Sequence, residues 1–326
     1  MTVPLLQTQA LSLHFPIRGG VLQREVGRVQ AVTEVDLTLH EGEVLGVVGE
    51  SGCGKTTLAR TLVGLNKPTA GTLLHQGQDV ATMSAAERRQ MSRNVQMVFQ
   101  DPYASLNPRQ RVQQILATPF DCHCLPAGAE RQARVVELLQ LVGLSPEHLS
   151  RYPHEFSGGQ RQRIGIARAL ALQPQVVVLD EPLSALDMSI QSQVLNLLVE
   201  LQQRLRLSYV FISHDLSVVQ YLCDTVLVMY LGRVVEAAPA AELFATPLHP
   251  YTQSLLDAVP NPDPRHARPE QVLEGDVPSP SKPPPGCAFH PRCPRAVDRC
   301  LVEKPLLQTV AGPSHLAACH LLSTPL

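Results

Sequence analysis

The chain alternates between short apolar runs, glycine-rich turns and longer amphipathic stretches. The apolar runs at residues 44–48, 95–99, 175–179 and 209–212 are rich in valine and leucine, as in strands buried on both faces of a parallel sheet. Residues 5–39 end in strict alternation of apolar and polar positions, which predicts antiparallel strands around a turn-rich insertion at residues 18–20. The pattern predicts an α/β fold in which an antiparallel sheet leads into the first buried strand.

Helical periodicity appears between the buried strands. Residues 112–142 have an apolar helical face that Gly143 ends, and residues 194–205 form a second amphipathic stretch. Ser84 and Glu87 have the spacing of a capping box, which predicts another helix start. Helices and buried strands therefore alternate along most of the chain.

Composition excludes several classes of protein. The 326 residues are 44% hydrophobic and 17% charged, which is typical of a globular chain. The formal net charge of −2 supplies no bulk positive field, so we expect no nucleic-acid partner. No secretory signal begins the sequence and no apolar stretch is long enough to cross a bilayer, so we expect a soluble protein in the cytoplasm.

A glycine-rich loop follows the first buried strand. Residues 49–56 read GESGCGKT and lead into a predicted helix, which is the required setting of a phosphate-binding loop. Its backbone N–H groups would face one anion, with Lys55 reaching the β- and γ-phosphates and the Thr56 hydroxyl reaching Mg²⁺. The predicted nucleotide-binding residues here are Gly49, Glu50, Ser51, Gly52, Cys53, Gly54, Lys55, Thr56 and Thr57.

A second predicted anion-binding helix start lies about a hundred residues later. Ser157 stands at an N-cap position, Gly158 and Gly159 permit close approach by a ligand, and Gln160 opens a long helical stretch. One chain therefore carries two phosphate-type sites.

Polar residues at the ends of the other buried strands complete the predicted chemistry. Asp180 ends one strand where a Mg²⁺ ligand is expected, and Glu181 beside it is placed to orient or deprotonate water. Gln100 follows another strand and can contact Mg²⁺ and the attacking water. His214 follows a third strand and is predicted to contact the γ-phosphate.

In this order, these residues resemble the ATP-binding subunit of an ABC transporter. The match comprises a Walker A loop at residues 49–56, a Q-loop at Gln100, a signature at residues 157–160, a Walker B strand ending at Asp180 and Glu181, a D-loop ending at Asp187, and a switch histidine at His214. The resemblance implies a P-loop NTPase fold over residues 1–248, with a RecA-like core, an antiparallel β subdomain and a helical signature subdomain at about residues 101–170.

Three further segments resemble the dipeptide and oligopeptide importers, specifically the second of their two ATPase subunits. They lie at residues 98–109, 249–256 and 286–294. The resemblance implies a peripheral protein on the cytoplasmic face of the bacterial inner membrane, in a heterodimer with a second ABC ATPase. Two transmembrane permeases and, indirectly, an extracytoplasmic peptide-binding protein would complete the translocase.

The resemblance also assigns roles within that heterodimer. The subunits close head to tail, so Ser157, Gly158, Gly159, Gln160 and Asp187 of one chain serve the nucleotide of the other. Residues 101–109 would transmit closure to the permeases. Two alternatives stay open: the same machine with nickel, glutathione or murein peptide as cargo, and a soluble non-transport ABC ATPase.

Adenine recognition departs from the family pattern. An aromatic residue often stacks on the base shortly before the phosphate loop, but the corresponding positions, residues 26–28, hold Val26, Gly27 and Arg28. Phe15 is the alternative across the insertion.

The last part of the chain, residues 249–326, differs in composition. Proline-rich segments at residues 260–264 and 278–285 predict an irregular extension after one helix at residues 249–259. It contains Cys287, Cys293, Cys300 and Cys319, whose thiolates can hold either Zn²⁺ or an iron–sulfur cluster, since their spacing decides little. The importer resemblance favours a 4Fe-4S cluster over zinc and over free thiols.

Overall fold

The computed structural model describes residues 3–20, 23–125, 128–258, 275–312 and 314–322. Its centre is an eight-stranded sheet in the order β11-β12-β10-β9-β3-β8-β7-β6. Five neighbouring strands of this sheet run parallel, as the apolar runs predict: β9 (Thr225–Tyr230), β3 (Val44–Val48), β8 (Ser208–Ile212), β7 (Val176–Asp180) and β6 (Val95–Val98).

The parallel strands are buried because both faces of the sheet are covered. In β3, Leu45 and Val47 pack into the core shared with the N-terminal sheet, whereas Val44 and Val48 pack into the core on the opposite face. The other parallel strands alternate in the same way, which is the two-residue period of a strand. A continuous apolar run is the sequence of a strand with two covered faces.

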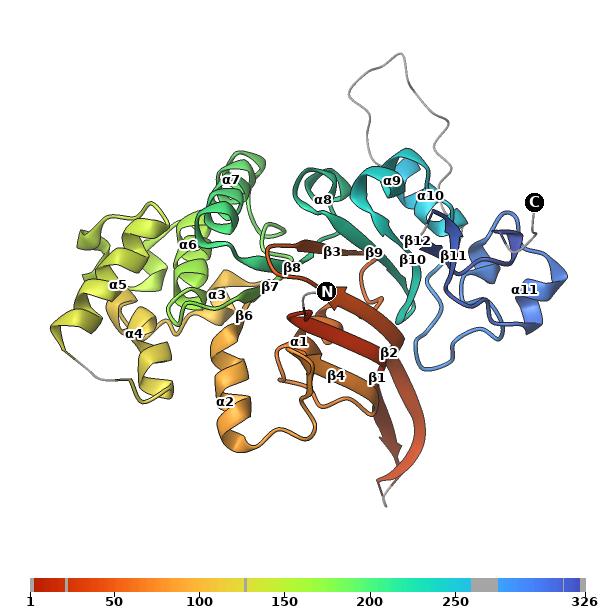
Figure 1. Ribbon diagram of the computed structural model, residues 1–326, viewed down its shortest axis with the longest axis horizontal. Helices are drawn as coiled ribbons and strands as arrows, with labels where there is room; N and C mark the ends of the chain where they lie inside the picture. Colours follow the sequence, from red (N-terminus) through yellow and green to blue (C-terminus); the bar gives the residue numbers. More distant parts are fainter. Residues whose placement is uncertain (1–2, 21–22, 126–127, 259–274, 313, 323–326) are drawn as a thin grey trace, which may run out of the picture.

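The N-terminal region forms a separate antiparallel sheet in the order β2-β1-β4-β5. Figure 1 shows β2, β1 and β4 of this sheet side by side. The predicted strand pair over residues 5–39 is confirmed. The strands are β1 (Leu6–Gly19), β2 (Arg24–Leu39), β4 (Ala70–His75) and β5 (Gln78–Asp79).

Eleven α-helices lie within the described residues. The predicted capping box at the start of α2 is confirmed, since the Ser84 hydroxyl accepts from the Glu87 N–H and the Glu87 carboxylate accepts from the Ser84 N–H. The helices are α1 (Lys55–Leu62), α2 (Ala85–Asn94), α3 (Pro102–Ser105), α4 (Val112–Cys122), α5 (Ala129–Leu141), α6 (Gly158–Ala169), α7 (Met188–Leu205), α8 (Leu216–Leu222), α9 (Ala240–Ala245), α10 (Pro250–Asp257) and α11 (Asp298–Val302). None of them combines the length and apolar character needed to cross a bilayer.

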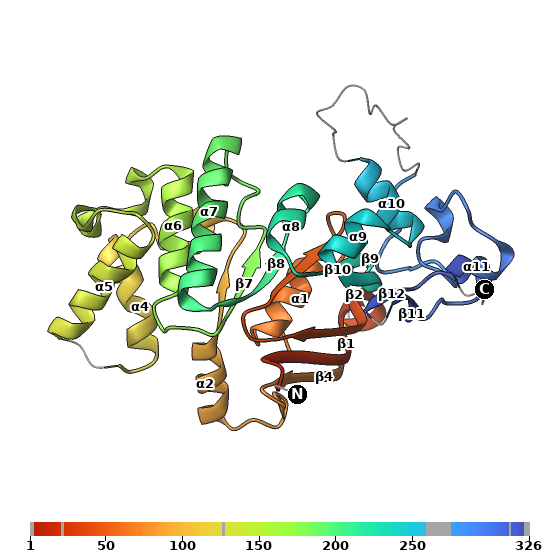
Figure 2. The same cartoon turned by 45° about the horizontal axis from the view of Figure 1, so that its top comes forward.

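Two predicted helices differ in extent. The periodic stretch at residues 112–142 is two helices, α4 and α5, because α4 ends at Cys122 and Cys124 has a positive φ of 54°. Helix α7 begins at Met188, six residues before the predicted start, because its first turns are exposed and carry few apolar residues. Helices α3 to α6 occupy one end of the molecule, opposite the end that carries α11 (Figures 1 and 2).

The C-terminal extension is more ordered than its composition predicts. Strand β12 (His315–Ala317) pairs antiparallel with β10 (Arg233–Pro239), and β11 (Gln308–Ala311) pairs with β12, so the tail adds two strands to the central sheet. The prediction of an irregular extension after one helix is therefore wrong for residues 298–302, 308–311 and 315–317. Residues 278–285 are irregular as predicted, whereas residues 260–264 and Val259 lie outside the described residues.

Short 3₁₀ turns complete the described chain. They are η1 (Pro146–Ser150), η2 (Pro153–Glu155), η4 (His290–Arg292) and η5 (His320–Leu322).

Candidate nucleotide-binding site

The loop between β3 and α1 has a backbone that only glycine permits at two positions. Gly49 has a φ of 149°, and a Cβ atom there would lie 2.2 Å from the Met229 carbonyl oxygen. Gly54 has a φ of 107°, and a Cβ atom would lie 2.0 Å from the Ala31 carbonyl oxygen. The glycines thus allow the loop to curl tightly against β9 and β2 before α1 begins.

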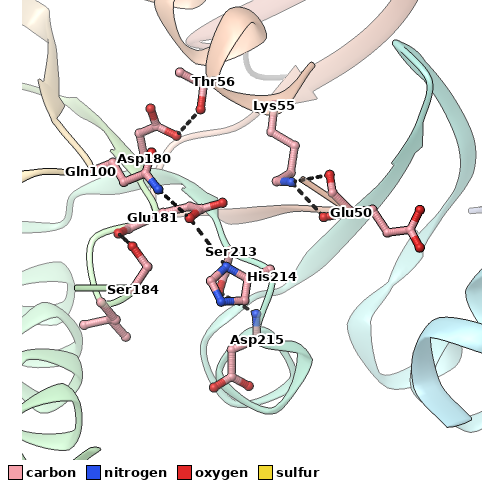
Figure 3. A network of polar contacts seen from close by, with 12 residues as sticks. Glu50, Lys55, Thr56, Gln100, Asp180, Glu181, Ser184, Ser213, His214 and Asp215 are labelled. Carbon is pink, nitrogen blue, oxygen red and sulfur yellow. Dashed lines mark hydrogen bonds and ion pairs between the residues drawn. The ribbon is translucent and has the colours of Figure 1, made fainter. Parts of the chain in front are cut away.

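Lys55 lies across this loop and is 4% exposed. Its Nζ donates to the carbonyl oxygens of Gly49 at 2.7 Å and Glu50 at 2.9 Å, as Figure 3 shows, and lies 3.8 Å from Cys53 Sγ. Among the described residues no carboxylate is within ion-pair distance of Nζ. The ammonium charge is therefore available to an anion in the curl of the loop, which fits the predicted phosphate site.

Thr56 and Asp180 meet at the mouth of the loop. Thr56 Oγ1 donates to Asp180 Oδ1 at 3.0 Å, although the two residues are 124 positions apart (Figure 3). Asp180 is 2% exposed; burial raises the pKa of its carboxyl, and the nearby Glu181 charge adds to the rise. A hydroxyl and a poorly solvated carboxylate are hard oxygen ligands that favour a divalent cation, so this donor pair fits Mg²⁺.

The predicted catalytic side chains meet at the Glu181 carboxylate. Gln100 Nε2 donates to Glu181 Oε2 at 2.9 Å, and His214 Nδ1 lies 3.4 Å from the same oxygen (Figure 3). The three residues follow β6, β7 and β8, whose carboxyl ends share one edge of the sheet. Glu181 has a φ of 45°, an unfavourable value for a glutamate, at the turn that aims its carboxylate at this edge.

The second predicted anion site lies at the start of α6. Ser157 caps this helix, and its hydroxyl accepts from the Gln160 N–H at 3.4 Å while the Gln160 side chain accepts from the Ser157 N–H at 3.1 Å. A Cβ atom at Gly159 would lie 2.2 Å from Ile190 Cγ2, so this glycine is also required for the packing of α6 on α7. Ser157 is exposed, and within the described chain the recorded side-chain hydrogen bonds of residues 157–160 stay inside the motif.

The segment after Gln100 packs on the same helix. Tyr103 lies in α3, and the Arg161 guanidinium is 3.9 Å from the centroid of its ring. Arg168 Nη1 donates to the Ser105 carbonyl oxygen at 2.6 Å. Residues 101–109 are therefore attached to the signature helix α6, while most of the Tyr103 side chain stays exposed.

Two other predicted residues remain without a defined role. Asp187 is exposed and precedes α7, but its side chain makes no capping hydrogen bond. Phe15 is 42% exposed on β1, opposite Val29 in the strand pair. Its role in adenine stacking stays a prediction.

Sequence reasoning missed two tail residues that contact the phosphate loop. Arg292 Nη1 and Nη2 donate to the two carboxylate oxygens of Glu50 at 2.7 and 3.0 Å, and the Glu50 N–H donates to the Tyr251 hydroxyl at 2.9 Å. Both tail residues lie in segments that mark the importer resemblance, at residues 249–256 and 286–294. The sequence therefore indicates these two residues only as members of the importer motifs, and motif membership does not predict which residues they contact.

The four tail cysteines lie in one region without forming a ready metal site. Burial raises the pKa of the Cys287 thiol to about 11. The nearby cysteines Cys293, Cys300 and Cys319 contribute to this rise, because a thiolate at Cys287 would be repelled by a negative charge on any of them. The Cys287 N–H donates to the Cys300 carbonyl oxygen at 2.9 Å. Within the described ranges, however, no group of three or more histidine, cysteine or acidic side chains is arranged to hold a metal ion.

The arrangement of the phosphate loop, the acidic strand end and the signature helix defines an ATP-binding cassette. Residues 32–184 match the family model for ABC transporters, and residues 235–300 match that for the C-terminal region of oligopeptide/dipeptide transporters. A dimeric structure of the ATP-binding cassette MJ0796, in a post-hydrolysis state with ADP and Pi, has a TM-score of 0.64 at 25% identity. The matched region covers 72% of the present chain and 98% of the MJ0796 chain.

Curated relatives match almost the whole chain. The oligopeptide transport ATP-binding protein AppF of Bacillus subtilis (strain 168) is 52% identical over 98% of both chains. The di/tripeptide transport ATP-binding protein DppF of Pseudomonas aeruginosa (strain UCBPP-PA14) is 50% identical over 97% of both chains. The chain therefore belongs to the ABC transporter ATP-binding proteins of the oligopeptide/dipeptide group, and it is an ATPase.

Proposed function

We propose that this chain is the ATP-hydrolysing motor subunit of a bacterial ABC importer for dipeptides or oligopeptides. The observation that carries the proposal is that one chain joins an ABC cassette at residues 32–184 to the C-terminal region of oligopeptide/dipeptide transporters at residues 235–300. The relatives named for oligopeptide and di/tripeptide transport support the same cargo class.

The phosphate loop supplies binding. Lys55 and the backbone N–H groups of residues 49–57 would hold the β- and γ-phosphates of ATP, with the start of α1 adding its dipole. Thr56 and Asp180 would hold Mg²⁺, which neutralises charge on the phosphate oxygens when bound. Because Asp180 is buried, its preference for a positive partner is stronger than that of a solvated aspartate.

Glu181 is proposed as the residue that polarises the attacking water. Its Oε2 receives a hydrogen bond from Gln100 and faces His214, so both neighbours fix its direction. His214 would then hold the water and the γ-phosphate, while Gln100 would report the state of the site to the segment at residues 101–109. General-base catalysis of this kind contributes about 10²–10⁴-fold to rate.

A complete site needs a second subunit. Ser157, Gly158, Gly159 and Gln160 would close over the partner's nucleotide, with Asp187 at the same interface. The exposure of Ser157 and the dimeric state named for the MJ0796 cassette support this arrangement. We propose a heterodimer with a second ABC ATPase beneath two permeases on the cytoplasmic face of the inner membrane, supplied by an extracytoplasmic peptide-binding protein.

The test is hydrolysis and uptake by the assembled transporter. Glu181→Gln should retain ATP binding and lose hydrolysis by about 10²–10⁴-fold, while Glu200→Gln, an exposed change on α7, should behave as wild type. Wild-type vesicles should take up labelled dipeptide and not Ni²⁺ or glutathione. An intact hydrolysis rate in Glu181→Gln contradicts the assigned mechanism, and uptake of another cargo contradicts the peptide assignment.

We further propose that Cys287, Cys293, Cys300 and Cys319 bind a 4Fe-4S cluster, with Zn²⁺ as the alternative. Four thiols in one region are a suitable donor set for either, and binding would require the side chains to turn toward a common centre. Anaerobic purification followed by iron, sulfide and zinc analysis distinguishes the two. A metal-free protein that assembles normally would contradict both.

A further inference from the structure

Glu50 is the point at which the tail reaches the phosphate loop. Its carbonyl oxygen accepts from Lys55 Nζ, its N–H donates to the Tyr251 hydroxyl, and its carboxylate is paired with Arg292. Backbone and side chain of one loop residue are thus tied to the phosphate-binding lysine on one side and to two tail elements on the other.

The carboxylate of Glu50 would oppose nucleotide binding if it were unpaired. It is a negative charge in a loop that must receive phosphates, and Figure 3 shows it turned away from Lys55 and Asp180. The two-pronged contact with Arg292 both cancels the charge and fixes the direction of the side chain. The contact is partly shielded from solvent, because the Arg292 side chain is 6% exposed and the Glu50 side chain 25% exposed.

Arg292 is itself held by a packed aromatic cluster. Its guanidinium lies 6.0 Å from the centroid of the Tyr230 ring, and Tyr230 meets the rings of Tyr251 and Phe289 at 4.7 and 5.3 Å. Tyr230 belongs to β9, whereas Tyr251 and Phe289 belong to the tail. The arginine therefore contacts both the packed aromatic cluster and the phosphate loop.

We propose that Arg292 is a positioning residue of the nucleotide site and, through Glu50, sets the affinity of the phosphate loop for MgATP. Docking of α10 and of residues 286–293 is then coupled to nucleotide binding, and each strengthens the other to the same extent. This inference rests on the proposed ATP-binding function, and it adds a tail residue to that site.

The test is a four-member cycle in the full-length chain: wild type, Arg292→Gln, Glu50→Gln and the double variant. Binding of a non-hydrolysable ATP analogue with Mg²⁺ is measured by titration. In the wild-type background, Arg292→Gln should weaken binding about ten-fold, within the usual range of coupling between sites. In the Glu50→Gln background, Arg292→Gln should change affinity by less than about two-fold, because the charge that it compensates is gone.

Arg299→Gln is the matched control. Arg299 forms an exposed pair with Glu303 in the same tail, so its loss should leave nucleotide affinity unchanged. If Arg292→Gln weakens binding equally in both Glu50 backgrounds, or no more than Arg299→Gln does, the inference is overturned. A wild-type chain that binds no nucleotide would instead contradict the proposed function.

Two readouts separate positioning from a general structural effect. In the assembled transporter, Arg292→Gln should raise KM for ATP with kcat within about two-fold of wild type, since Arg292 does not touch the reacting atoms. The ATP analogue should also slow amide hydrogen exchange at residues 290–293 in wild type and not in Glu50→Gln, which keeps the backbone contacts of residue 50. Equal protection in both chains would refute the coupling even if Arg292→Gln failed to fold.

Discussion

Glu236 lies in β10, where its fully buried carboxylate fastens the tail to the cassette. It accepts hydrogen bonds from the N–H groups of Leu248 and His249 at 2.8 and 2.9 Å and faces His315 Nε2 at 2.7 Å. The first two donors lead into α10, and His315 begins β12. We therefore predict that Glu236→Gln loosens both tail elements together.

The size of the effect follows from the three donors. A glutamine presents one NH₂ in place of an acceptor oxygen, so at least one buried donor of the three loses its partner, at a cost of about 1–3 kcal/mol. The remaining hydrogen bonds lose the strengthening that an ionised acceptor gives. The sum is about 3 kcal/mol, because the weakening of the remaining hydrogen bonds adds to the cost of the unsatisfied donor.

Hydrogen exchange measures this change where it occurs. If β12 opens locally, about 3 kcal/mol corresponds to roughly 150-fold faster exchange of the amides in residues 308–317. Glu242→Gln is the control, since that carboxylate is 53% exposed and 4.0 Å from the same histidine, and its effect should stay below about 1 kcal/mol. Protection in Glu236→Gln within three-fold of the Glu242→Gln value would refute the reasoning.

Three other changes test separate parts of the molecule. Lys55→Ala should abolish hydrolysis at this loop but leave the partner's site active, measured as residual turnover of the heterodimer; unchanged turnover at both sites contradicts it. Gly159→Ala should lower the free energy of unfolding by about 1–3 kcal/mol in a denaturant titration, because the new Cβ meets the rigid Ile190 side chain. Adding Ile190→Ala to that variant should recover the lost stability. Burial lowers the pKa of His249 to about 3, below its unfolded value, so the stability it contributes is complete above about pH 6.5 and falls by about 1.4 kcal/mol at pH 5.5. His249→Asn, which can still cap α10, should remove that part of the pH dependence; an identical pH profile would count against the assignment.

The features that could be predicted from sequence are the local ones. The strand at residues 44–48 is apolar throughout because both of its faces are covered, and a run of that kind is visible without knowing its neighbours. Helix caps at Ser84 and Ser157 involve partners three residues away. The convergence of Gln100, Glu181 and His214 could also be predicted, since the carboxyl ends of parallel strands share one edge of the sheet.

The features that could not be predicted depend on distant partners or on weak patterns. Glu50 and Arg292 are 242 positions apart, and each is unremarkable among the charged residues around it. Strand β12 has three residues, too few to show a two-residue period. The first turns of α7 contain residues 188–193, which are largely polar, so the apolar face of the helix cannot be recognised there from the sequence.

The buried contact at Glu236 also sets a limit on what the tail can transmit to the phosphate loop. A coupling between two sites cannot exceed the free energy that distinguishes the two states of the element joining them. Replacing Glu236 costs about 3 kcal/mol at one of the contacts that hold the tail, whereas a ten-fold change in nucleotide affinity through Arg292 requires about 1.4 kcal/mol. The docked tail is therefore firm enough to act on Glu50 without being displaced when the loop is empty, and a loosened tail should lose this influence before the cassette itself unfolds.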